Sequence, residues 1–377
     1  MIKIVMPTSF DRELPERLHE ANQRHADRQI QVAELFGSLP RTPTGSGRPE
    51  RSLPRIDRAG FERHVGEIRE LGFGFTCLFN TSCTANREFD GQVRNQFIDE
   101  LLWVRDIGAT ALVLASPYLI DLARRHVPDL RVHVSSIAFA KSTKEAAHYL
   151  RRGARRLILD PDTVRDFRFI RKLRRECPEL ELEVLCNHPC LLNCPYETYC
   201  YNSVSHASTA SDTTPYEGFS LLNCNRDKLG AVVEFVKGSW FRPQDVHHYE
   251  EAGVAAIKIA GRGRSTDWLV RCAEAYLSRH YEGDMMDLVW EAQLTAVWKS
   301  TGVSGAPPRP VRVEASAFDG FIEFFARNTP DCGKGCGACR FCDGYAERAL
   351  AVNPTELERA RETLDRSLKS LLERPVA

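Results

Sequence analysis

The feature that most constrains the fold is a regular alternation of short apolar, β-branched runs with amphipathic segments of helical length. Eight runs predict strands, at residues 2–5, 30–36, 74–79, 111–115, 131–135, 156–159, 182–185 and 255–259. Segments between them predict helices, at 57–71, 97–107, 117–126, 143–152, 161–176 and 243–252. Strands joined by helices run parallel, and eight is the number that closes a barrel, so the sequence predicts a TIM-like (β/α)8 fold. An open doubly wound sheet is the alternative, but no Gly-rich turn follows the first strand.

Two connections are longer than a barrel needs. Residues 37–52, rich in Gly, Pro and Arg, predict a mobile lid or a binding loop over the barrel mouth. Residues 187–254 form a long excursion between the seventh and eighth strands. A Gly-Ala-Pro-Pro stretch at 305–308 marks a boundary, and a closing helix is predicted from 354 to about 373. We therefore expect a barrel over residues 1–290 and a small Cys-rich C-terminal module over residues 291–377.

Composition excludes several classes of protein. Fifty-one basic residues balance fifty-one acidic ones, so no overall field draws the chain to nucleic acid, and a nucleic-acid partner is not expected. No apolar run approaches a membrane span, and the N-terminus does not read as a signal peptide. We expect a cytoplasmic protein without a membrane partner. The basic run 151–156 is interpreted as a solvated helix end.

Thirteen cysteines are the strongest chemical signal. In a reducing compartment such density indicates metal binding more than disulfides, and soft thiolates select zinc, Cu(I) or iron–sulfur clusters. Most of these cysteines fall in two groups. The first follows the seventh predicted strand, and the second lies within the run DCGKGCGACRFC.

The first group is expected to bind a 4Fe-4S cluster, because active sites of this fold lie at the carboxyl ends of the strands and loops there bring distant residues together. The favoured ligands are Cys83, Cys190, Cys194 and Cys224, with Cys186 and Cys200 as substitutes. Three others, Cys77, Cys177 and Cys272, are expected to be inert thiols.

The second group has the spacing Cys-x3-Cys-x2-Cys-x2-Cys and consists of Cys332, Cys336, Cys339 and Cys342. This spacing is that of a bacterial ferredoxin run read in reverse order, and the glycines between the cysteines let the backbone wrap closely around a cofactor. A second iron–sulfur cluster is the favoured interpretation, and a zinc site is the alternative.

Polar residues near the strand ends complete the predicted site. Four are proposed as catalytic or substrate-binding groups: His188, Arg242, Lys258 and Arg262. His188 would move a proton, and the cations would hold an anionic or hydroxylated small molecule, with Arg262 best suited to clamp a carboxylate. Salt bridges on the barrel rim are the alternative role for the arginines.

At this point the residues carry a family resemblance. The runs CLLNCPY (190–196), NTSC (80–83), WFRPQD (240–245) and AIKIAGR (256–262) resemble the peptidase U32 family over roughly residues 1–290. That family is named for collagenase-like proteases and includes UbiU/UbiV-type iron–sulfur proteins, which hydroxylate a ubiquinone precursor without dioxygen, and relatives that hydroxylate RNA bases. The resemblance implies a barrel with a cluster at its mouth. The C-terminal cysteine run is not shared with the UbiU/UbiV pair.

Three classes of function follow from these observations. The first is an iron–sulfur enzyme that hydroxylates a small metabolite without dioxygen, with RNA-base hydroxylation as a variant. The second is a U32-type peptidase, although the chain has no His-Glu-x-x-His and no Gly-x-Ser-x-Gly motif. The third is a non-catalytic scaffold or an electron-transfer subunit that needs a homologous partner chain or an electron donor.

Overall fold

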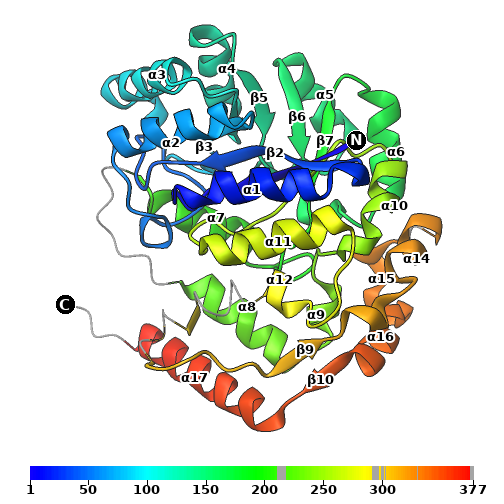
Figure 1. The fold of residues 1–377 in the computed structure, drawn as a ribbon. Helices are drawn as coiled ribbons and strands as arrows, with labels where there is room; N and C mark the ends of the chain where they lie inside the picture. Colours follow the sequence, from blue (N-terminus) through cyan, green and yellow to red (C-terminus); the bar gives the residue numbers. More distant parts are fainter. Residues whose placement is uncertain (210–217, 291–296, 299–300, 302, 329, 374–377) are drawn as a thin grey trace.

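The computed structural model describes residues 1–209, 218–290, 297–298, 301, 303–328 and 330–373, and its centre is a closed parallel barrel (Figure 1). The barrel closes because β8 pairs with β1, with Ala256 beside Lys3. This architecture confirms the predicted (β/α)8 fold. In chain order its strands are β1 (Ile2–Pro7), β2 (Ile30–Gly37), β3 (Gly74–Phe79), β4 (Ala111–Leu114), β5 (Arg131–Val134), β6 (Ala154–Ile158), β7 (Glu181–Leu185) and β8 (Ala256–Lys258).

Helices surround the strands and bury one apolar stripe each. On α6, for example, the buried residues Phe167, Ile170 and Leu173 recur at helical spacing, and the Asp166 carboxylate caps the first turn by accepting from Phe169 N–H. The outer helices are α1 (Glu13–Arg24), α2 (Arg58–Glu70), α3 (Gly91–Asp106), α4 (Pro117–His126), α5 (Thr143–Arg151), α6 (Phe167–Glu176), α10 (Val246–Glu251) and α11 (Thr266–Ser278). The first of these, α1, was not among the predicted helices.

The barrel interior is packed solid, as in other barrels of this kind. One part is an apolar cluster of Val5, Phe36, Leu78, Val113, Ile158 and Ala256. The other is a buried ion network centred on Arg156, whose guanidinium donates to Glu34 Oε1 at 2.7 Å and to Glu183 Oε2 at 3.0 Å. Arg156 is fully buried, so the interpretation of the run 151–156 as a solvated helix end is wrong for this residue.

The long excursion before β8 carries α7 (Glu197–His206), α8 (Phe219–Gly230) and α9 (Glu234–Lys237). Residues 210–217 of this excursion lie outside the described residues. The loop after β2 packs against α7: Ser46 N–H donates to Ser208 Oγ at 2.7 Å, and Gly47 N–H donates to Asn80 Oδ1 at 3.1 Å. Residues 42–47 are buried, so this predicted lid is a packed plug.

The C-terminal elements gather along one side of the barrel, beside α8 and α9 (Figure 1). They are α12 (Met286–Val289), β9 (Val311–Val313), α14 (Phe321–Asn328), α15 (Cys332–Cys339), α16 (Phe341–Ala349), β10 (Leu350–Val352) and α17 (Pro354–Leu372). Their buried side chains, such as Phe321 and Leu364, belong to the same hydrophobic core as the barrel helices. The predicted boundary after residue 290 falls on residues 291–296, outside the described residues, and stays a prediction. None of the described helices combines the length and the apolar character needed to cross a membrane.

Candidate functional site

The candidate site lies where the loops after the strands meet, at the carboxyl end of the barrel. The loop after β7 supplies Cys190 and Cys194, the first turns of α7 supply Cys200, and the middle of α8 supplies Cys224. We call these four residues the mouth cysteines. Three of them are half-buried, and Cys224 is buried.

Electrostatic coupling shows that the mouth cysteines lie close together. Burial raises the pKa of Cys224, and the charges of Cys190, Cys194 and Cys200 raise it further. The pKa of Cys200 is raised to about 12, first by burial and then by the charge of Cys190. Like charges raise one another's pKa only at short range, so the four thiols share one site.

Cys200 is therefore better placed than Cys83 to be the fourth ligand. The Cys83 thiol lies on the loop after β3, where it accepts a hydrogen bond from Ala85 N–H at 3.4 Å. The described contacts of Cys83 do not join it to the mouth cysteines. Cys186, the other predicted substitute, is buried at the end of β7 and donates to Lys258 O at 3.3 Å. Burial raises the pKa of Cys186 to about 12, as for a core thiol.

His188 lies beside Cys190 and changes its ionisation. Burial alone would raise the pKa of the Cys190 thiol, but the charge of His188 and a hydrogen bond with it lower that pKa to about 7. The same pair raises the pKa of His188 against the opposing effect of burial. In the described part of the chain, His188 Nδ1 is buried without a hydrogen-bond partner. A thiol that ionises near neutral pH is suited to ligate a metal centre.

The spacing of the thiols fits a cluster better than a single zinc ion. Four thiolates around one tetrahedral zinc, with Zn–S bonds of about 2.3 Å, would lie about 3.8 Å apart. Among the described residues, no three cysteine thiols lie within 4.8 Å of one another. A cubane cluster separates its four thiolates more widely, because each one binds a different iron. The donor set, four soft thiolates, therefore fits a 4Fe-4S cluster.

Two arginines also enter the mouth. Arg262 follows β8, and its Nη1 donates to Ser38 Oγ at 3.4 Å. Arg48, on the loop after β2, donates to Gly47 O at 2.9 Å, and its charge acts on Arg262, His188 and Cys190. Burial lowers the pKa of Arg262, and Arg48 lowers it further. Of the described carboxylates, none lies within ion-pair distance of either arginine.

Two other predicted site residues have structural roles instead. Lys258 donates from Nζ to Glu183 Oε1 at 3.0 Å inside the barrel, and its ammonium lies 4.1 Å from the centre of the Phe36 ring. The buried Arg242 forms two hydrogen bonds with Asp245 and a third with Asp319 Oδ1 at 2.7 Å. Their positive charges are therefore already neutralised, and neither is free to bind a substrate.

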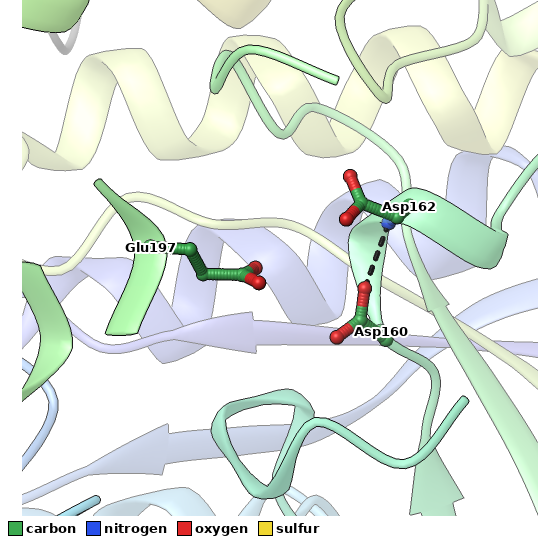
Figure 2. A group of neighbouring side chains, drawn as sticks. All are labelled: Asp160, Asp162 and Glu197. Atoms are coloured by element: carbon green, nitrogen blue, oxygen red, sulfur yellow. Dashed lines mark hydrogen bonds between the residues drawn. The ribbon is translucent and has the colours of Figure 1, made fainter. Parts of the chain in front are cut away.

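Three carboxylates lie together beside the cysteine loop (Figure 2). Asp160 Oδ1 accepts from Asp162 N–H at 2.9 Å, and Glu197 faces them from the start of α7. The Lys141 ammonium lies 2.9 Å from Asp162 Oδ2 and 3.5 Å from Glu197 Oε2, so a lysine already supplies the cation of this cluster. Burial, assisted by the charge of Glu197, raises the pKa of Asp160 to about 7.

A large cavity of the described chain lies elsewhere. It is an open groove of about 980 Å³ beside α2, and no cysteine lines it. Four arginines line this groove, together with three acidic residues: Arg12, Arg51, Arg55 and Arg63, with Glu50, Asp57 and Glu67. Its size therefore does not identify it as the centre of the chemistry.

Sequence reasoning missed Arg48, Lys141 and Glu197. Arg48 belongs to a loop that the sequence did identify, but its approach to the cysteines depends on how that loop packs on α7. Lys141 and Glu197 come from the segments after β5 and β7, and their ion pair forms only when the fold brings these segments together, so no local pattern could have identified it.

Comparisons with known proteins agree with the geometry. A family model described as "Peptidase family U32" matches residues 56–285. The "Uncharacterized protease MJ1657" of Methanocaldococcus jannaschii is 27% identical over 316 residues, which cover 82% of this chain and 86% of that protein. The "tRNA hydroxylation protein P" of Escherichia coli is 24% identical over 245 residues, which cover 63% of this chain and 49% of that protein.

A solved structure adds support for the fold. The U32 peptidase Mk0906 superposes with a TM-score of 0.51 at 18% identity, covering 68% of this chain and 92% of that one. At this identity the likeness speaks for the barrel architecture alone.

Proposed function

The chain belongs to peptidase family U32, and from this premise we propose that it is an iron–sulfur enzyme that performs a hydroxylation-type redox reaction at its barrel mouth. The observation that carries the proposal is the meeting of four thiols with two arginines that have no described carboxylate partner. The relatives named for tRNA hydroxylation support a hydroxylation-related role for this chain.

The mouth cysteines Cys190, Cys194, Cys200 and Cys224 would hold the cluster. With four thiolate ligands a 4Fe-4S cluster supplies one-electron transfer, whereas three ligands leave an iron open to bind substrate as a Lewis acid. The chain's own residues do the remaining work. The buried residues 42–47 pack on Ser208 and Asn80 and so fix the position of Arg48, which follows them.

Arg48 and Arg262 define the chemistry of the substrate. Two guanidinium groups at close range repel each other, and a bound carboxylate or phosphate would relieve that repulsion. We therefore propose an anionic small molecule as substrate, held by these two side chains beside the mouth cysteines. The inserted oxygen atom would come from a donor other than dioxygen; with water as that donor, the reaction would release two protons and two electrons and would need a one-electron acceptor.

The test combines binding and product analysis under anaerobic conditions. Cluster-loaded protein is incubated with a panel of carboxylic and phosphorylated metabolites, and hydroxylated products are identified by mass spectrometry, with isotopically labelled water as one oxygen donor. Replacement of Arg262 or Arg48 by Met should weaken binding about tenfold or more, because a charge-assisted hydrogen bond is lost. The exposed Arg55→Met is the matched control. Equal affinities in all variants would reject the two arginines as substrate ligands.

RNA is the alternative substrate, favoured by the relatives and by the arginine-lined groove beside α2. Phosphate contacts make RNA binding strongly dependent on salt. Binding of transfer RNA that weakens steeply between low and physiological salt, and that is reduced by Arg55→Met but not by Arg262→Met, would favour this reading.

A peptidase is the second candidate, because Cys190 and His188 form a thiol–imidazole pair of the kind that activates a cysteine nucleophile. Against it, no described group orients His188 through Nδ1, and three further thiols surround Cys190. Peptide cleavage that survives removal of iron and is lost in Cys190→Ser would establish the peptidase.

A further inference from the structure

The four C-terminal cysteines converge as closely in space as they do in sequence. Cys332, Cys336 and Cys339 lie on α15 at spacings of four and three residues, which place them on one face of the helix. The chain then turns through Arg340, whose φ of 49° is left-handed, and α16 begins at Phe341. That turn brings Cys342 back, so all four cysteines line one cavity of about 110 Å³. We call Cys332, Cys336, Cys339 and Cys342 the C-terminal cysteines.

A buried cation without a carboxylate partner faces the same cavity. Arg165, 8% exposed, donates to the carbonyls of Val236, Gly238 and Trp240, and its guanidinium lies 4.8 Å from the centre of the Phe321 ring. Its Nε has no hydrogen-bond partner among the described residues. None of the described carboxylates forms an ion pair with it. Burying a charge that is not neutralised costs folding free energy, so an anion bound in the cavity would stabilise this guanidinium.

The ionisable groups best placed to supply that anion are the thiols. Cys342 and Cys332 line the cavity beside Arg165, and Cys342 exerts the strongest attraction on its charge, ahead of Tyr249 and Cys332. The ammonium of Lys237 is attracted first by Glu234 and then by Cys336. Both cations line the cavity. A cluster bound by four thiolates carries net negative charge, which Arg165 would offset, whereas Lys237 already pairs with Glu234 at 2.7 Å.

We propose that the C-terminal cysteines bind a second iron–sulfur cluster, placed to exchange an electron with the cluster of the mouth cysteines. Zinc fits less well, because no three of the described thiols are within 4.8 Å of one another, whereas a tetrahedral zinc needs thiolates about 3.8 Å apart. The second site stands independently of the proposed function. Only its role as an electron relay rests on that function.

The relay follows from how the two cysteine groups are connected. Leu192, between Cys190 and Cys194, lines the cavity of the C-terminal cysteines. Gly238 packs against the Cys190 carbonyl, since a Cβ there would lie 3.4 Å from that oxygen, and the Gly238 carbonyl accepts from Arg165. The loop that carries Cys190 and Cys194 therefore also borders the cavity of the C-terminal cysteines.

The direction of electron flow follows from the proposed reaction. Hydroxylation with water as the oxygen donor would release two protons and two electrons. Cys339 is exposed and can meet an oxidised one-electron carrier protein. The mouth cluster would pass the electrons one at a time to the C-terminal cluster, which would pass them to that carrier, so each step oxidises one centre and reduces the next by one electron.

Metal counting tests the site without relying on activity. Anaerobically purified, full-length protein should hold about eight iron and eight sulfide per chain, against about four in Cys339→Ser and about four in Cys190→Ser. Circular dichroism checks that each variant is folded, and point variants are used because the C-terminal helices share the barrel core. Four iron with one zinc per chain, or an iron content unchanged by Cys339→Ser, would overturn the second cluster. If the mouth cysteines bind no cluster but the C-terminal cysteines do, the wild-type chain would hold about four iron, and Cys339→Ser would lose them.

The charge-balancing role has a matched pair of variants. Arg165→Met should lower the midpoint potential of the C-terminal cluster or abolish its binding, since a buried positive charge stabilises the reduced state. The exposed Arg168→Met, on the rim of the same cavity, should leave both unchanged. Equal effects of the two substitutions would remove Arg165 from the proposal.

The relay is tested by electron paramagnetic resonance after reduction with Ti(III) citrate. Two neighbouring reduced clusters should give a broadened, spin-coupled spectrum in the wild type, and simple spectra in Cys190→Ser and Cys339→Ser. A wild-type spectrum equal to the sum of the two variants, or a cluster that accepts no electron, would overturn the relay and leave the second site standing.

Discussion

The mouth cysteines and the C-terminal cysteines each bring four thiols together, but they do so in different ways. The mouth cysteines come from three segments, spread over residues 190–224, that meet only because the barrel brings their loops together. The C-terminal cysteines come from eleven consecutive residues, 332–342, and need only a helix and one left-handed turn. In the mouth group Cys224 is buried and the other three cysteines are half-buried, whereas Cys339 of the C-terminal group is exposed. The less accessible group is suited to chemistry and the more accessible one to electron exchange.

The largest expected effect concerns the membership of the mouth group. Cys200→Ser should abolish the mouth cluster, with a loss of about four iron per chain, because Cys200 couples to the other three thiols. Cys83→Ser should keep its iron. Iron content and the visible absorption of purified protein measure both. The opposite ranking would restore the quartet predicted from sequence.

The next largest effect is expected from loss of the ion pairs of Arg242, which link the segment before β8 to the C-terminal part of the chain. Arg242 binds the buried Asp245 near the mouth loops and Asp319 in the C-terminal part. Arg242→Met should lower the free energy of unfolding by about 4 kcal/mol, because it leaves Asp245 buried without its cation. The control is Arg327→Met, which breaks an exposed pair with Glu323 and should cost less than about 1 kcal/mol. Urea denaturation measures both, and similar losses would contradict the role of Arg242.

A smaller effect should appear in the pH dependence of the free energy of unfolding, to which the Asp160 carboxyl contributes. The pKa of this carboxyl is raised to about 7 in the folded chain, so the folded state holds a proton that the unfolded state releases. Its contribution is complete below about pH 4 and is lost as the pH rises through about 7. Asp160→Asn should flatten the stability profile over this range by a few kcal/mol at most, while the exposed Asp129→Asn keeps the wild-type slope. Thermal denaturation across pH 4–8 checks this. An unchanged slope in Asp160→Asn would contradict it.

The smallest effect compares access to the two groups after metal removal. In folded, chelator-treated protein, Cys339 is exposed and Cys224 is 6% exposed. Iodoacetamide should therefore modify Cys339 at least about tenfold faster than Cys224, since thiol reactivity requires access as well as ionisation. Peptide mass mapping over time gives both rates. Equal rates would mean that the mouth opens when its metal is lost.

The barrel strands were predictable because their signal is local. Strand β3 was predicted at its observed bounds, and the other seven to within two residues at either end. The helix expected at 161–176 instead divides into a short 3-10 turn and α6, because two aspartates each cap a turn: Asp160 accepts from Asp162 N–H and Asp166 accepts from Phe169 N–H. Local propensity identifies such elements, but side-chain caps decide where they begin.

The roles of individual charges were not predictable in the same way. From their positions near strand ends, Lys258 and Arg242 were predicted to bind substrate. In the structure, Glu183 neutralises Lys258 and Asp245 neutralises Arg242. Arg156 read as a surface charge, and it lies fully buried between two glutamates of other strands. A cation's partner can come from anywhere in the chain, so its role depends on contacts that no local pattern records.

By itself the sequence determined the periodic elements, the barrel they close and the C-terminal cysteine run, because each depends on residues a few positions apart. The tertiary structure alone decided that Cys200 joins Cys190, Cys194 and Cys224, and that Arg48 meets Arg262. It also decided that Arg165 faces the second cysteine group. These meetings join segments up to about 200 residues apart, and the closing of the barrel, through the packing of its loops and the C-terminal helices, brings them within range of one another.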